Sequence, residues 1–122
     1  MPVYDVTASA IYGDNKPEWA DLTAAGIFRV PHEGGRFDRH YHDYDEYWLI
    51  YRGTARVMSE GVEYEVGPGS IVCTQAGQEH DVIAISEDVE AFFFETALRP
   101  GGTPGHLHRS PELADGHEVE QR

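Results

Sequence analysis

The middle of the chain, residues 27–98, is a succession of short β-branched and aromatic runs separated by turns that contain glycine. Short strands at such regular spacing are typical of an all-β sandwich or barrel. The expected strands are 27–30, 47–51, 54–58, 62–66, 70–74, 81–85 and 89–98. Arg52-Gly53, between the second and third runs, predicts a tight hairpin.

Two segments that flank this expected barrel differ from it in composition. Residues 1–26 begin with a strand-like stretch around Val3, Tyr4 and Val6. They continue with 15–22, where Pro17 and the acids around it, followed by Gly26, predict one short helix. Residues 99–122 are rich in proline, glycine and polar side chains. We expect this tail to be mobile or to lie over the barrel surface.

The charge of the chain excludes several function classes. Nine Lys and Arg stand against 22 Asp and Glu, for a net charge of −13. Such an acidic chain repels phosphate backbones, so nucleic-acid binding is not expected. No apolar run reaches the length of a membrane helix. The start lacks a signal-peptide pattern and the single cysteine, Cys73, permits no internal disulfide, which together predict a cytoplasmic protein. Cys73 itself is expected to be a buried, inert strand residue.

Histidines and a carboxylate form the candidate site. His40 and His42 are two residues apart, so on a strand both imidazoles face the same way. On a straight strand Glu46 would lie about 13 Å beyond His42, too far to share an ion. The polar triplet 43–45 suits a turn that brings it back. His80 follows a separate turn at Gly77. A lone His-x-His pair is more often a surface feature than a metal site, so the wider pattern decides.

That pattern is a fixed framework of glycines around the four residues. It runs Gly34-x5-His40-x-His42-x3-Glu46-x6-Gly53, then Gly69-x5-Gln75-x-Gly77-x2-His80-x3-Ala84. With this spacing the sequence resembles the cupin superfamily, as a small single-domain metal-binding member. The first motif matches at every position. The second has Gln75 where proline is usual and Ala84 where asparagine is usual, and neither is a metal ligand.

The resemblance implies a double-stranded β-helix, or jelly-roll, barrel over 27–98. It also implies one divalent transition metal ion held by His40, His42, Glu46 and His80. This nitrogen and oxygen donor set suits Fe, Mn, Ni, Co, Cu or Zn without selecting among them. Four ligands on an octahedral ion leave two positions open, which marks a catalytic site. The alternative is a cupin fold that keeps these residues and binds no ion.

Strand parity predicts the surroundings of the ion. If Glu46 faces inward, Trp48 and Ile50 do so too and form part of the substrate pocket. Their neighbours on the other face are too apolar for water and predict packing against a second sheet or in a homodimer: Tyr47, Leu49 and Tyr51. The aromatic run 92–94 is expected to supply core on both faces of a barrel wall.

Further residues are candidates for ligand contact. Parity along the strand of His40 directs Arg36 and Asp38 toward the pocket mouth, where a guanidinium can hold a carboxylate or phosphate. A rim arginine that neutralises nearby acids is the more common case. Tyr44 is expected to shape the site beside Glu46, which is both ligand and base. The tail pair 106–108 repeats His-x-His, and a solvated tail is favoured over a pocket lid or adventitious metal binding.

The resemblance implies function less closely than fold, because cupins include several reaction classes. We expect an enzyme that acts on a small oxygenated molecule, sugar-like or keto-acid-like, with isomerase, epimerase or lyase chemistry slightly preferred. An iron dioxygenase and a non-catalytic module that binds or senses a small molecule remain alternatives. The acidic barrel favours a neutral or singly charged ligand.

Overall fold

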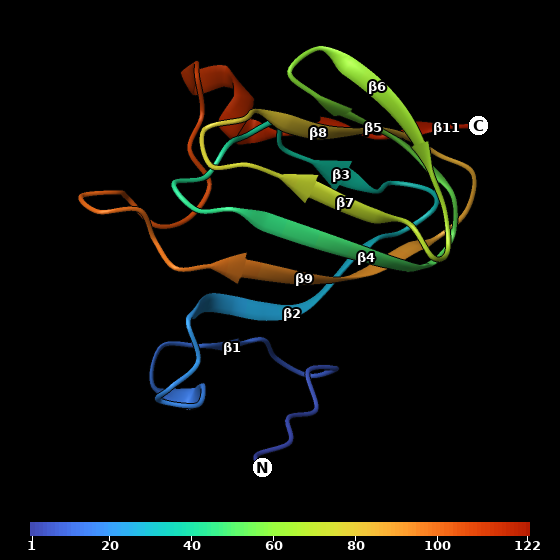
Figure 1. Ribbon diagram of the computed structural model, residues 1–122. Helices are drawn as coiled ribbons and strands as arrows, with labels where there is room; N and C mark the ends of the chain where they lie inside the picture. The colour runs from blue at the N-terminus through green and yellow to red at the C-terminus, as the bar shows by residue number, and fades with distance from the viewer.

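The strands assemble into two facing sheets in the computed structural model, which describes residues 1–122 (Figure 1). One sheet has the order β1-β2-β9-β4-β7, the other β11-β8-β5-β6, and β10 pairs with β3. The strands are β1 (Ile11–Tyr12), β2 (Leu22–Val30), β3 (Arg36–Phe37), β4 (Glu46–Arg52), β5 (Ala55–Ser59), β6 (Val62–Val66), β7 (Ile71–Thr74), β8 (His80–Ile85), β9 (Val89–Thr96), β10 (His117–Glu118) and β11 (Glu120–Gln121). Two 3₁₀ turns, η1 (Gly13–Asn15) and η2 (Pro111–Asp115), complete the chain. The predicted all-β jelly-roll architecture is confirmed.

The predicted hairpin at Arg52-Gly53 is wrong. β4 pairs with β7 and β9, whereas β5 pairs with β6 and β8 in the other sheet. The chain therefore crosses from one sheet to the other at Gly53, which has a φ of 81°. A Cβ there would lie 2.2 Å from the carbonyl oxygen of Asp88. Glycine is needed for this close crossing, and the local sequence does not reveal which strands pair across it.

The expected helix over 15–22 is also wrong, because η1 ends at Asn15 and β2 begins at Leu22. β2 pairs along its length with β9, so sheet formation overrides the local helix signal. Residues 1–7 form no strand, and the N-terminal edge strand is β1 instead.

The core lies between the two sheets. β4 and β9 contribute Trp48, Ile50 and Ala91 from one side, so the inward parity predicted for Trp48 and Ile50 is what the structure has. Val57 and Ile85 contribute from the other side. Burying a side chain such as Ile85 away from water stabilises the fold by about 1.5–3 kcal/mol.

The tail, residues 99–122, lies against the barrel. β10 pairs with β3, β11 pairs in parallel with β8, and between them Val119 enters the core with 2% of its surface exposed. Both terminal nitrogens of the Arg122 guanidinium contact the Glu65 carboxylate, at 2.6 and 2.7 Å.

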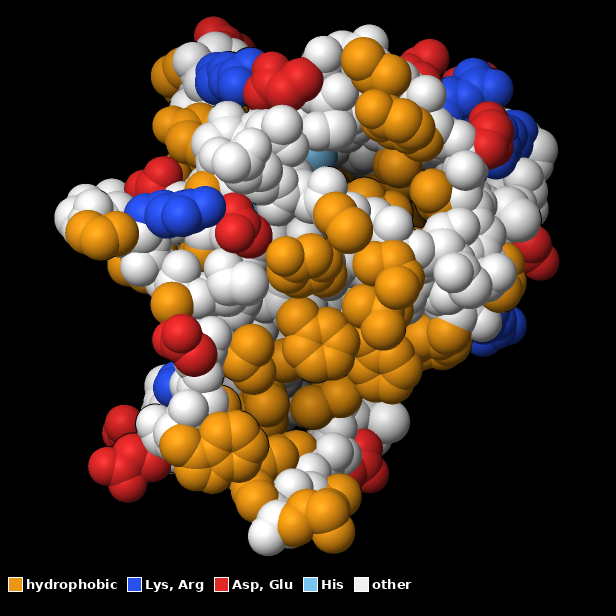
Figure 2. Space-filling model, viewed as in Figure 1, with side chains coloured by type: hydrophobic (Ala, Val, Ile, Leu, Met, Phe, Trp, Pro, Cys, Tyr) orange, Lys and Arg blue, Asp and Glu red, His pale blue; other side chains and the backbone are white.

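The outer face of the larger sheet is apolar and exposed. Figure 2 shows apolar side chains gathered on this face, and among the exposed ones are Tyr47, Tyr51, Ile71, Phe92 and Phe94. The aromatic run 92–94 therefore supplies core on one face only, and Cys73 is exposed rather than buried. The homodimer stays a prediction. None of the chain's helices is long and apolar enough to pass through a membrane.

Candidate metal centre

Four buried side chains converge at one end of the barrel. The ring nitrogens of His40, His42 and His80 and the carboxylate of Glu46 all lie within 4.8 Å of one another. Each of these residues is at most 6% exposed. The backbones of His40 and His80 form an antiparallel bridge, with N–H···O distances of 3.1 and 2.8 Å. This bridge places ligands from two motifs side by side, although 40 residues separate them along the chain.

Glu46 reaches the histidines because the chain bends at 43–44. The bend is tied from outside: the Asp45 carboxylate accepts a hydrogen bond from the Ala76 amide at 2.8 Å and from the Arg99 guanidinium at 2.9 Å. The Asp43 carboxylate accepts one from the Thr103 amide at 2.8 Å. The polar triplet 43–45 thus forms the turn that its composition predicted.

The three imidazole rings share one hydrogen-bonding pattern. In each ring Nδ1 is bonded to a backbone carbonyl: His40 to Asp38, His42 to Gly105 at 3.0 Å and His80 to Gln78 at 3.2 Å. These bonds fix the Nε2 atoms as the free ring nitrogens.

Two of those nitrogens have no partner. Nε2 of His42 and Nε2 of His80 are buried without a hydrogen bond, and lie 3.3 and 3.4 Å from Oε1 of Glu46. Buried polar atoms in native proteins nearly always have a hydrogen-bond partner. The two unpartnered Nε2 atoms therefore indicate a bound group that the chain itself does not supply. A cation between imidazole and carboxylate donors fits that requirement.

The protonation of the cluster also suits a cation. Burial lowers the pKa of His40 to about 3, and the nearby His80 and His106 act in the same direction. Burial acts to raise the pKa of Glu46, but the imidazoles of His42 and His80, whose Nε2 atoms lie 3.3 and 3.4 Å from its carboxylate, outweigh it and bring that pKa to about 2. For His42, burial acts to lower the pKa, yet the Glu46 carboxylate raises it overall. Near neutral pH the site therefore offers a neutral His40 and an ionised Glu46.

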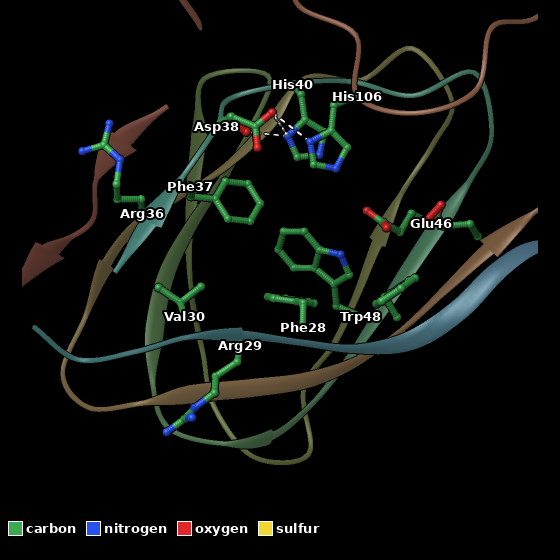
Figure 3. A pocket seen from close by; sticks show the side chains of 12 residues that line it. Phe28, Arg29, Val30, Arg36, Phe37, Asp38, His40, Glu46, Trp48 and His106 are labelled. Atoms are coloured by element: carbon green, nitrogen blue, oxygen red, sulfur yellow. Dashed lines mark hydrogen bonds and ion pairs between the residues drawn. The ribbon is translucent and has the colours of Figure 1, made fainter. Parts of the chain in front are cut away.

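A cavity of about 240 Å³ opens beside His40 and Glu46. Four aromatic side chains line it: Phe28, Phe37, Trp48 and Phe93. Figure 3 shows the first three facing one another across the cavity. Such a wall excludes water from whatever binds beside the cluster.

The expected ligand-contacting residues fall in different places. Asp38, Trp48 and Arg36 line the cavity, but Figure 3 shows the Arg36 guanidinium turned away from the aromatic rings. Its Nη2 donates to the Asp115 carbonyl at 3.3 Å. Ile50 is in the core and not in the cavity wall. Tyr44 is buried and stacks on His42, with ring centroids 4.6 Å apart, so it packs behind a candidate ligand.

Glu95 was missed by the sequence analysis. It lies on β9 directly opposite Glu46 and lines the cavity. Burial raises its pKa, while a hydrogen bond with Tyr44 acts to lower it. Strand parity offered a signal, because Glu95 is two residues from the inward-facing Phe93.

The expectation of a solvated His106-x-His108 pair holds only in part: the His106 side chain is 51% exposed and that of His108 17%, but both are docked on the barrel. His106 lines the cavity and stacks on His40, with ring centroids 3.7 Å apart and planes inclined by 6°. Both tail histidines contact one oxygen of Asp38, His106 through Nδ1 at 2.8 Å and His108 through Nε2 at 2.7 Å. Burial acts to raise the pKa of Asp38, but these two hydrogen bonds lower it overall. Tail contacts of this kind are non-local, so a glycine-rich sequence gave no sign of them.

Comparison with known proteins agrees with this geometry. The cupin domain family model matches residues 26–96. The uncharacterized protein y4oW of Sinorhizobium fredii (strain NBRC 101917 / NGR234) is 41% identical over 71 residues, 58% of this chain. The matched part is only 33% of that relative's length.

Solved structures with the same fold include three proteins. The DMSP lyase DddQ from Ruegeria pomeroyi superposes with a TM-score of 0.61 at 25% identity, over 72% of this chain and 45% of the other. A predicted oxalate decarboxylase from Thermotoga maritima superposes with a TM-score of 0.58 at 19% identity, over 64% of this chain and 69% of the other. A cupin-2 domain protein from Shewanella frigidimarina superposes with a TM-score of 0.54 at 22% identity, over 66% of this chain and 74% of the other.

The family model covers more than half of the chain, and the ligand-like cluster lies within the matched residues. The chain therefore belongs to the cupin family.

Proposed function

We propose that this chain is a metal-dependent cupin enzyme that acts on a small oxygenated molecule by isomerase, epimerase or lyase chemistry. One observation carries the proposal: the buried, unpartnered Nε2 atoms of His42 and His80 face the Glu46 carboxylate at the edge of a cavity of about 240 Å³. The donors suit Fe, Mn, Ni, Co, Cu or Zn. His40, His42, Glu46 and His80 would hold the ion. When bound, it supplies Lewis acidity to oxygen atoms of the ligand.

The chain's own residues bind and orient the molecule. The rings of Phe28, Trp48 and Phe93 pack against its carbon skeleton and keep water out. Glu95, whose pKa burial raises, is placed across from Glu46, so the two carboxyl groups differ in their readiness to hold a proton.

The charge of the cavity restricts the ligand. Its acidic lining comprises Asp38, Glu46 and Glu95. Of its two arginines, Arg29 is paired with Asp88 at 2.9 Å and the Arg36 guanidinium points away from the aromatic rings. This arrangement supports a neutral or singly charged molecule, sugar-like or keto-acid-like, over a multiply charged anion. The preference for non-oxidative chemistry has support from DddQ, which is a lyase at 25% identity.

The test begins with metal measured in protein purified without a His tag. We expect about one divalent ion per chain, lost in His42→Ala and kept in His32→Ala, a control at an exposed histidine. Substoichiometric metal that Fe, Mn, Ni and Zn all fail to restore would contradict the proposal.

Reaction class is tested with the metal-loaded protein on sugars, keto acids, diols and catechols, with and without oxygen. Turnover under anaerobic conditions supports isomerase or lyase chemistry. Oxygen uptake would identify the dioxygenase alternative instead. Saturable binding of a ligand that stays unchanged after long incubation would identify a sensing or binding module.

A further inference from the structure

We propose that the C-terminal segment 104–108 orients the candidate metal ligands His40 and His42 without itself binding the ion. This segment lies outside the residues that match the family model. The proposal rests on metal binding by the cluster described above. It assigns the tail a role in the site beyond covering the barrel.

The segment docks directly on the stretch of chain between β3 and β4 that carries the two histidines. Leu107 forms an antiparallel bridge with Tyr41, the residue between them, with N–H···O distances of 2.9 and 3.0 Å. One residue earlier than His106, the Gly105 carbonyl accepts the Nδ1–H of His42 at 3.0 Å. The tail backbone therefore sets both the tautomer and the rotation of the His42 ring.

Tail side chains act on His40 through Asp38. The Asp38 carbonyl is bonded to Nδ1 of His40, and the carboxylate of the same residue receives both His106 and His108. The His106 ring also lies flat on the His40 ring, as Figure 3 shows, at a centroid distance of 3.7 Å. The tail therefore acts on His40 in two ways. It holds Asp38, whose carbonyl is bonded to Nδ1 of His40, and it stacks the His106 ring on the His40 ring.

Two of the three candidate imidazole ligands therefore owe their orientation to this segment. Loss of such outer partners typically weakens metal binding by about 10- to 100-fold, because the ligands must be ordered when the ion binds. The coupling is reciprocal, so a bound ion should also stabilise the docked tail.

The experiment measures Co²⁺ affinity by chelator competition, together with the visible absorption of the Co²⁺-loaded protein. It uses the full chain, because truncation would also remove Val119 from the core. The test variant is the double change H106A/H108A. The rescue variant is H106N/H108Q, since the Asn and Gln amide nitrogens can take the places of the imidazole Nδ1 and Nε2 that contact Asp38.

A matched control is available in the same tail. His117 donates to Asp81 at 2.7 Å, again a tail histidine on a carboxylate, but Asp81 points to the opposite face of β8 from His80. We expect H106A/H108A to weaken Co²⁺ binding by about 10- to 100-fold and alter the spectrum. H106N/H108Q should recover most of the affinity, and H117A should stay within about twofold of wild type.

Three results would overturn the proposal. If H106A/H108A folds and binds Co²⁺ as wild type does, the tail is only a cover, while metal binding and the proposed function stand. If H117A weakens binding as much as the double change, the effect is a general loss of tail packing. If the wild type itself binds no ion, both the proposed function and the proposed role of segment 104–108 are refuted.

Discussion

Removal of one candidate ligand should remove most of the stabilisation of the fold by metal. An ion that binds only the folded chain adds about 2.7 kcal/mol to the free energy of unfolding at a concentration 100 times its Kd. For a chain of 122 residues, unfolding entropies of about 2.1 cal/mol/K per residue convert this into a rise in Tm of about 10 °C.

His42→Ala removes a buried nitrogen that has no other partner than the proposed ion. Loss of this direct ligand should weaken binding by at least about 100-fold, the upper end of what an outer partner costs. At the same metal concentration the stabilisation then falls to about 0.4 kcal/mol, a rise in Tm of about 2 °C.

The assay is thermal unfolding followed by circular dichroism, with each protein compared with its own metal-free form. That comparison separates metal linkage from any direct effect of the substitution on stability. His32→Ala, at an exposed histidine, should keep the full shift of the wild type. An undiminished shift in His42→Ala would refute the assignment of this residue as a ligand.

Four further expectations follow from the fold and the cluster. Gly53→Ala should lower the free energy of unfolding by more than about 1 kcal/mol in urea titrations, because φ is 81° and the new Cβ would meet the Asp88 carbonyl; wild-type stability would show that the crossing can relax. Val119→Ala should cost about 1.5–3 kcal/mol, and a negligible cost would mean that the tail does not pack into the core. If the apolar outer face pairs two copies, Tyr51→Glu should convert a dimer into a monomer in light scattering, whereas a wild-type monomer would end that prediction. Because the neighbouring Glu46 carboxylate raises the pKa of His42 above its ordinary value of 6.5, protons compete with Co²⁺ for this nitrogen already above that pH, so Co²⁺ affinity should begin to fall above pH 6.5 as the pH is lowered; an affinity that stays constant to below pH 6.5 would contradict this.

The resemblance of the two motifs to cupins predicted the full cluster, and residue pattern accounts for part of it. His40 and His42 are two residues apart, so in extended backbone both can face the same way, and the polar residues 43–45 could only be a turn if Glu46 was to join them. The strands themselves follow from β-branched and aromatic runs between glycines. These patterns depend on residues close together in the sequence, and the structure confirms the strands and the turn that they predicted.

What the sequence did not reveal depends on contacts between distant segments. The chain crosses between sheets at Gly53, and no local signal distinguishes that from a hairpin. The Asp38 carboxylate contacts His106 and His108, which lie about 70 residues further along the chain. The spacing of apolar and polar residues cannot predict a contact over such a separation. Cys73 faces solvent because the outer side of β7 has no covering layer, which parity alone cannot tell.

The most direct test of the account is a crystal of the metal-loaded chain with the ion located by anomalous scattering. We expect a single strong peak within coordination distance of the ring nitrogens of His40, His42 and His80 and of the Glu46 carboxylate. The expected distances are about 2.0–2.2 Å for zinc. A peak bound instead by Asp38 and the tail histidines, or no ordered peak at all, would contradict it.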